Sequence, residues 1–224
     1  MTACSPFMEY VNNVALRTLR ETTDAEVLVL GNNTPSSSKV NDLAALCSLL
    51  GFRFTFIPGH FSQSKFWNYG IDHTQGKYVV FGNADCIFYQ DWLARIIELW
   101  EEEPDYYALW PWSMSTKDYG LAYRVSLEYE RKIIPTHHPA VVLVMKRESG
   151  YRWDEQFALW EMDADFMNHC GQNNHKLGLC MWSRVDHFNS TVSGNIHFPD
   201  HFGDDQSEHN GNATERLKRK WNLK

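Results

Sequence analysis

Apolar and polar residues follow two alternating periods along the first half of the chain. Apolar residues recur at helical spacing from Phe7 to Leu19, which predicts an amphipathic helix, and alternate from Phe52 to Ile57, which predicts a strand. The predicted elements are, in order, a short candidate strand over 2–4, a helix over 7–21, a strand over 26–30, a helix over 39–50, a strand over 52–57, a helix over 64–75, a strand over 78–82 and a helix over 90–102. Because alternating strands and helices are typical of a parallel sheet flanked by helices, this order predicts the α/β class.

The pattern is less regular in the second half. Strands are predicted over 106–112 and 141–145, with an irregular or helical segment over 113–136 between them. A helix is predicted at or near 163–169 and another over the last dozen residues, whereas everything after about residue 183 is interpreted as loops beside a site. No linker or internal repeat interrupts the 224 residues. We therefore expect a single domain with a central, mostly parallel sheet and a smaller mixed β part in its second half.

Composition and charge exclude several classes of protein. Hydrophobic residues make up 43% of the chain, which argues against disorder, and the net charge of −7 argues against a general nucleic-acid-binding surface. The basic segment 216–220 is interpreted as a solvated helix end. Five cysteines without a Cys-x-x-Cys pair indicate reduced thiols, and the lack of an 18-residue apolar run predicts no membrane span. These features lead us to expect a cytoplasmic location.

One carboxylate follows the predicted central strand. A helix end, a turn at Gly76 and the apolar run from Tyr78 to Gly82 lead to Asp85. Ligands of open α/β sheets bind beyond the carboxyl ends of the strands, and a cation that holds a diphosphate takes oxygen ligands from one or two carboxylates. Asp85 is therefore a candidate cation ligand, with a turn-capping role as the alternative.

This segment resembles the donor-sugar motif of glycosyltransferases with the GT-A fold, in particular the inverting family 2. The family motif ends in Asp-x-Asp or Asn-x-Asp, and Asn83-Ala84-Asp85 stands in that place. Asn68-x-Gly70 and Gly76-Lys77-Tyr78 match the family upstream of it. The resemblance implies the Rossmann-like GT-A fold. It also implies a nucleotide-binding half over 1–103, an acceptor and catalytic part over 104–190, and C-terminal loops and a helix over 191–224.

The same resemblance assigns a metal site. Asp85 would hold Mn²⁺ or Mg²⁺ against the diphosphate, and Asn83 would hydrogen-bond the ribose or a water on the metal. His187 is implied as a second metal ligand, because imidazole suits ions of the manganese class. Three later histidines compete with it for this role: His197, His201 and His209.

Three further residues are implied to contact the nucleotide. Asn32 stands where the family usually has an Asp that reads the base, and an amide both donates and accepts hydrogen bonds. A turn-forming role for Asn32 is the alternative. Ser5 lies at the end of the first strand, and Asn68 belongs to the donor motif. A UDP-linked sugar is the favoured donor.

The segment from Trp153 to Phe166 resembles the acceptor block of the family. In that block the general base is an Asp that follows a Glu, and the matching residues are Asp163 and Met162. An alternative register makes Glu161 the important carboxylate, and Asp165 is assigned a structural role. A further alternative is that the two aspartates only interact with the amino terminus of a helix. A base opposite the leaving diphosphate implies direct displacement with inversion.

The resemblance therefore implies a metal-dependent inverting glycosyltransferase. It would move a sugar from a nucleotide diphosphate sugar to a hydroxyl of a glycan, a lipid-linked glycan or another acceptor. Two alternatives stay open. Asn32, Asn83 and Met162 depart from the family pattern, which favours a catalytically silent nucleotide- or sugar-binding domain. The chain end at Lys220-Trp221 resembles that of short family members from bacteria and large viruses. The second alternative is therefore a viral transferase that acts on a modified DNA base in the host cytoplasm.

Overall fold

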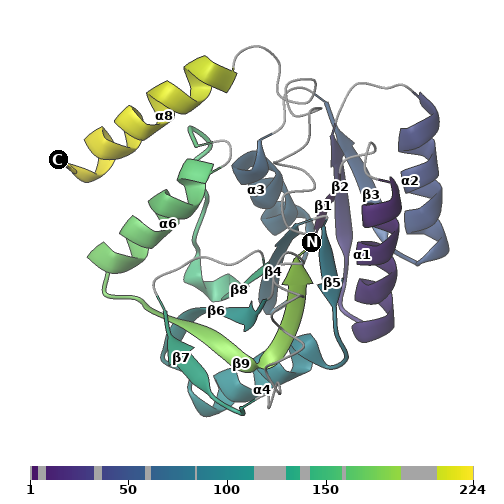
Figure 1. The fold of residues 1–224 in the computed structure, drawn as a ribbon, viewed down its shortest axis with the longest axis horizontal. Helices are drawn as coiled ribbons and strands as arrows, with labels where there is room; N and C mark the ends of the chain where they lie inside the picture. The colour runs from purple at the N-terminus through teal and green to yellow at the C-terminus, as the bar shows by residue number, and fades with distance from the viewer. Residues whose placement is uncertain are drawn as a thin grey trace, which may run out of the picture.

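The computed structural model describes residues 2–4, 9–32, 37–58, 62–83, 85–113, 130–136, 142–157, 160–187 and 206–223. Within these segments, helices pack against a nine-stranded sheet (Figure 1). The strands are β1 (Thr2–Cys4), β2 (Leu28–Asn32), β3 (Arg53–Ile57), β4 (Tyr78–Asn83), β5 (Cys86–Phe88), β6 (Tyr106–Trp112), β7 (Ile133–Pro135), β8 (Val142–Lys146) and β9 (Lys176–His187). The helices are α1 (Glu9–Thr22), α2 (Ser37–Leu49), α3 (Gln63–His73), α4 (Trp92–Glu102), the 3₁₀ turn η2 (Arg147–Ser149), α6 (Trp160–Gln172) and α8 (Gln206–Trp221).

The sheet has a parallel half and a mixed half. Its strand order is β3-β2-β1-β4-β8-β6-β9-β5, with β7 paired to β9 off this path. Strands β1 to β4 are mutually parallel, whereas β8 runs antiparallel to β4 and to β6. Beyond them β6 and β9 are parallel, and β5 and β7 run antiparallel to β9. The expected α/β fold, with a mixed β part in the second half, is confirmed.

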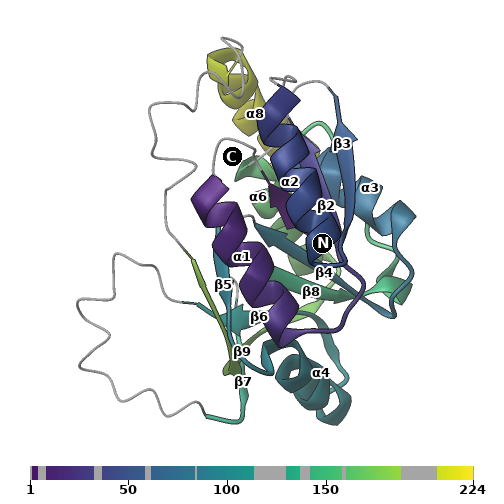
Figure 2. The same ribbon diagram turned by 90° about the vertical axis from the view of Figure 1, so that its right-hand side faces the viewer.

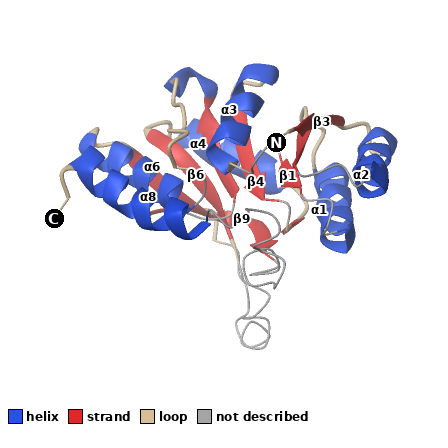
Figure 3. Cartoon of the chain, turned by 90° about the horizontal axis from the view of Figure 1, so that it is seen from above, coloured by secondary structure: helices blue, strands red, loops and turns tan. Residues whose placement is uncertain are grey.

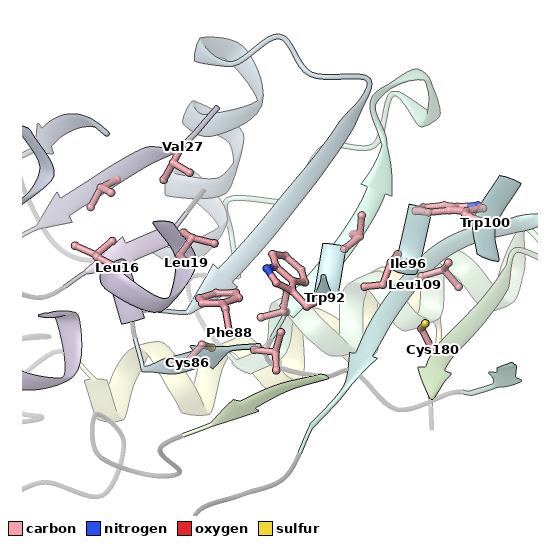
Figure 4. Close-up of a cluster of buried hydrophobic side chains, with 14 of the residues drawn as sticks. Leu16, Leu19, Val27, Cys86, Phe88, Trp92, Ile96, Trp100, Leu109 and Cys180 are labelled. Atoms are coloured by element: carbon pink, nitrogen blue, oxygen red, sulfur yellow. The ribbon is translucent and has the colours of Figure 1, made fainter. Parts of the chain in front are cut away.

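Two apolar cores lie on opposite faces of this sheet, because successive side chains of a strand point to opposite sides. In β8, Val142 and Val144 join one core, and Leu143 and Met145 join the other. Side chains of α1, α2 and α4 complete the first core, part of which Figure 4 shows around Trp92 and Phe88. Side chains of α3, α6 and α8 complete the second. Helices α6 and α8 therefore share a face that α1 and α2 do not (Figures 2 and 3).

Three strands correct the sequence-based expectations. The segment 113–136 was expected to be irregular or helical, yet Ile133–Pro135 is the strand β7. Residues after 183 were expected to be loops, yet β9 continues to His187, and no strand was expected for its first part or for β5. These strands carry polar residues or are very short, so the alternation of apolar residues that predicts a strand is weak in them. They form because β9 pairs with β5, β6 and β7, which are distant in sequence.

None of the helices in the described segments combines the length and apolar character needed to cross a membrane.

Candidate functional site

Asp85 and His187 lie together at the end of the central strand. Nε2 of His187 is 3.0 Å from Oδ2 of Asp85. The Asp85 side chain is 6% exposed and that of His187 is 21% exposed, so the pair is largely enclosed yet still open on the imidazole side. The sequence prediction named both residues for one site, and the structure brings them into contact.

Strand pairing explains this contact. Asp85 immediately precedes β5, and His187 is the last residue of β9. The antiparallel register sets Cys86 opposite His187, so a residue directly before β5 meets the end of β9. The site therefore depends on β5, a strand that the hydrophobic pattern did not reveal.

A buried polar group holds the end of β9 in place. Asp186 is fully buried, and its Oδ2 accepts a hydrogen bond of 2.8 Å from the Tyr89 hydroxyl. Arg184 donates from Nε to Asp186 Oδ1 at 2.8 Å and also pairs with Oδ2. The Arg184 guanidinium lies 4.4 Å from the centre of the Tyr89 ring. Sequence reasoning missed this group, although a carboxylate two residues after an arginine in a strand is a signal for such a pair.

Asn83 is the last residue of β4, and its amide has a partner in α3. Nε2 of Gln63, the first residue of α3, donates to Oδ1 of Asn83 at 2.9 Å. This contact orients the amide of Asn83, whose nitrogen can donate to a ligand and whose oxygen keeps a second lone pair. Gln63 was not among the predicted site residues.

Asn68 ties α3 to the acceptor block. Its Oδ1 accepts from the Trp153 backbone N–H at 2.9 Å, and its Nδ2 donates to the Trp153 carbonyl and to Glu155 Oε1, both at 2.9 Å. Asn68 is 5% exposed. The structure thus engages its whole amide in bonds to residues 153–155, and its contact with a donor stays a prediction.

Asp163 lies in the first turn of α6 and is partly exposed. Burial of the carboxyl raises the pKa of Asp163 to about 7. A carboxylate with this pKa can accept a proton near neutral pH far better than an ordinary aspartate. Glu161 is also partly exposed in this turn, so the alternative register stays open. Met162 is 2% exposed and packs in the second core, which gives the departure from the family's Glu a packing reason.

Asp165 is bound by the C-terminal helix. Oδ1 of Asp165 lies 2.7 Å from Lys220 Nζ and accepts a 2.7 Å hydrogen bond from Trp221 Nε1. Lys220 also lies 2.8 Å from Asp154 Oδ2. The basic segment was interpreted as a solvated helix end. Lys220 is exposed, as a solvated helix end would be, and it also pairs with two carboxylates from separate parts of the acceptor block.

The remaining predicted residues have less described surroundings. Ser5, His197 and His201 lie outside the described residues. Asn32 is the last residue of β2, paired with Ile57 of β3, and only its backbone is described. For His209 the description is likewise limited to the backbone, in α8.

Asp85 and His187 offer a carboxylate oxygen and an imidazole nitrogen to one position. This pair of donors suits a manganese-class cation. The described part of the chain contains no group of three or more His, Cys, Asp or Glu side chains that could hold a metal by themselves. Phosphate oxygens of a substrate commonly complete the coordination of such cations.

Solved structures with a similar fold are glycosyltransferases. GalNAc-T7, whose structure contains UDP, GalNAc and Mn²⁺, superposes with a TM-score of 0.66 at 11% identity, over 83% of this chain and 42% of that chain. Residues 1–349 of S. aureus TarS superpose with a TM-score of 0.63 at 11% identity, over 84% of this chain and 59% of that chain. The same TarS fragment in complex with UDP gives a TM-score of 0.61 at 10% identity, over 83% and 58% of the two chains. The present chain thus spans about half the length of these proteins, and the likeness shows a shared fold.

A search of curated protein sequences found no match. The sequence profile of glycosyl transferase family 2 matches residues 10–152, which is more than half of the chain and includes α3, β4 and Asp85. The chain therefore belongs to glycosyl transferase family 2.

Proposed function

We propose that this protein is a metal-dependent, inverting glycosyltransferase that uses a nucleotide diphosphate sugar, with UDP as the nucleotide. The observation that carries the proposal is the 3.0 Å contact between Asp85 and His187 beyond β4, in a chain of glycosyl transferase family 2. The acceptor is a hydroxyl of a glycan, a lipid-linked glycan or another carrier.

Asp85 and His187 are the residues that would hold the cation. A bound Mn²⁺ or Mg²⁺ supplies Lewis-acid stabilisation of the diphosphate that leaves. Asn83 offers its amide nitrogen to the ribose or the diphosphate, and Gln63 orients that amide through its oxygen. The structures of GalNAc-T7 with UDP and Mn²⁺ and of TarS with UDP support this choice of donor and metal.

Asp163 is the proposed general base. The acceptor oxygen attacks the anomeric carbon of the sugar, and its proton passes to the Asp163 carboxylate. The bond between the anomeric carbon and the diphosphate oxygen breaks, and the nucleoside diphosphate leaves with that electron pair. Because attack and departure occur on opposite faces, the anomeric configuration inverts. The raised pKa of Asp163 supports this role.

Calorimetric titration of UDP, GDP, CDP and dTDP, each with and without Mn²⁺, tests the donor site. We expect tight binding of UDP that is lost when Mn²⁺ is omitted. Tight binding of another nucleotide would replace UDP as the donor class. Failure of all four to bind to the folded protein would contradict the glycosyltransferase proposal.

A catalytically silent nucleotide-binding domain is the second candidate. It is favoured by the departures from the family pattern at Asn32, Asn83 and Met162. Turnover separates the two, because only an enzyme releases nucleoside diphosphate from its donor. The Asp163→Asn variant is the matched control, since it should bind donor and show no transfer.

A further inference from the structure

Helix α8 lies alongside α6 on the same face of the sheet (Figure 1). Contacts of α8 with α6 and with the turn before it come from residues 216, 217, 220 and 221. Leu217 is 9% exposed in the second core, and the Arg216 guanidinium donates to the Gln156 carbonyl at 3.3 Å. The helix therefore contacts both α6 and the turn that leads to it.

Lys220 joins these two parts of the acceptor block electrostatically. Its Nζ lies 2.8 Å from Asp154 in the turn and 2.7 Å from Asp165 in α6. It also lies 5.4 Å from the centre of the Phe157 ring. Although burial acts in the opposite direction, the two carboxylates raise the pKa of Lys220, so the ammonium stays charged.

Asp165 depends on α8 for its charge balance. It is 2% exposed, and in the described part of the chain the groups recorded at its Oδ1, Lys220 Nζ and Trp221 Nε1, both belong to α8. A buried carboxylate that loses its partners is strongly destabilised. Without these contacts the buried Asp165 is stabilised again only if it takes up a proton or if the first turns of α6 shift until it reaches water.

Helix geometry relates Asp165 to Asp163. Residues two positions apart on an α-helix point to nearly opposite sides, because each residue turns the helix by about 100°. Helix α8 thus contacts α6 through Asp165, on the side of α6 away from Asp163. Any displacement of this turn would move Asp163 with it, since the two residues share one rigid stretch of backbone.

We propose that α8 positions the proton-accepting turn of α6, and that Lys220 and Trp221 are positioning residues for Asp163. This inference rests on the proposed function insofar as Asp163 is the base. Neither residue is assigned a contact with substrate.

Four variants test the proposal. Lys220→Met removes the charge and keeps the length of the side chain, Lys220→Arg keeps the charge, and Trp221→Phe keeps a ring but removes the N–H. Lys218→Met is the matched control, because Lys218 pairs with Glu215 on the surface of the same helix. Each is compared with the wild type for UDP binding by calorimetry, for kcat and KM of donor turnover, and for the titration of the Asp163 carboxyl carbon by NMR, assigned with Asp163→Asn.

We expect Lys220→Met to bind UDP within about twofold of the wild type and to lose about 10- to 100-fold in kcat, on the scale of a misplaced catalytic group. Its Asp163 titration should move from about 7 toward the ordinary value of about 4, because the carboxyl becomes exposed. Lys220→Arg should keep kcat and the Asp163 titration close to those of the wild type, and Lys218→Met should match the wild type in both.

An unchanged Asp163 titration and kcat in Lys220→Met would overturn the proposal, as would equal losses in Lys218→Met. Should Lys220→Met fail to fold, Trp221→Phe decides by the same measurements, with a smaller shift in the same direction expected and no shift contradicting the proposal. A wild type that neither binds nor turns over nucleotides would contradict the proposed function. The NMR titration would still decide whether α8 positions Asp163.

Discussion

Nε2 of His187 lies 3.0 Å from Oδ2 of Asp85, although the two residues are far apart in the sequence. The antiparallel pairing of β5 with β9 creates this contact, since Cys86 stands opposite His187. Two side chains that share one position, one offering oxygen and the other nitrogen, are what a cation at a diphosphate needs.

Asp85→Asn should abolish the effect of Mn²⁺ on UDP binding. The amide keeps the size of the side chain and removes the charge that attracts the cation, so we expect metal-dependent affinity to fall at least about 100-fold, or about 2.7 kcal/mol. Calorimetry with and without Mn²⁺ measures this change. Asp91→Asn, an exposed carboxylate at the start of α4, is the control and should behave like the wild type. A retained metal effect in Asp85→Asn would contradict the site.

Activity should rise with pH through about 7 and then level. Asp163 accepts a proton only when it is ionised, and burial raises its pKa to about 7. The pH profile of kcat at saturating donor and acceptor measures this ionisation. Asp163→Asn should reduce kcat by about 10²- to 10⁴-fold and remove the inflection. A profile that is flat between pH 5 and 8 in the wild type would argue for another base, with Glu161 the first candidate.

Asp163→Asn should stabilise the fold above neutral pH. The folded-state pKa of Asp163 is raised above its ordinary value of 3.8. The stability that the protonated carboxyl contributes is therefore fully present below about pH 4 and is lost as pH rises through 7. Asparagine does not ionise, so the variant keeps its stability as pH rises. Its free energy of unfolding should exceed that of the wild type by an amount that grows between pH 4 and 7 to about 1–3 kcal/mol. Urea unfolding at pH 4.5 and pH 8 measures the difference. An advantage that does not depend on pH would contradict the assignment.

Asn68→Ala should destabilise the protein before it affects donor binding. The amide holds both backbone groups of Trp153, so its removal leaves buried polar groups unpaired at a cost of about 1–3 kcal/mol. Chemical unfolding gives the stability, and calorimetry with UDP at low temperature gives the affinity. Asn168→Ala is the control, because that amide bonds the Ala164 carbonyl within α6. A loss of affinity without a loss of stability would instead support a donor contact.

Gly178→Ala should destabilise the sheet around β9 by about 1–3 kcal/mol. A Cβ at this position of β9 would collide with Ile133 and come within 2.7 Å of Tyr106 and 2.9 Å of Leu109. Gly171→Ala in α6 is the control, since its Cβ would meet nothing within 4 Å and the change should be neutral or slightly stabilising. Thermal unfolding of both variants measures the contrast. Equal stability of the two would show that β7 and β6 do not pack against Gly178 as described.

The sequence indicated several elements of the site correctly. Periodic apolar residues predicted β2, α2, β3, α3, β4 and α4 within a few residues, because each element presents a regular apolar side to a core. The donor motif placed Asp85 just past β4, and the acceptor block placed Asp163 at the start of α6. These features depend on local patterns, which a sequence displays directly.

Other features required the tertiary structure. β9 was not predicted, because Arg184 and Asp186 break its apolar pattern. In the structure they pair with each other and with Tyr89. The two carboxylate partners of the exposed Lys220 were not predicted, because nothing near it in sequence shows that Asp154 and Asp165 lie beside it.

The sequence by itself determined which segments are helices and strands in the first half, the family resemblance and the candidate residues. The tertiary structure decided which of those residues meet, as Asp85 and His187 do, and which are held by others, as Asp165 is by Lys220 and Trp221. The physical reason is that periodicity reports how a segment buries its own apolar side. A contact between distant residues depends on strand register and helix packing, which no single segment encodes.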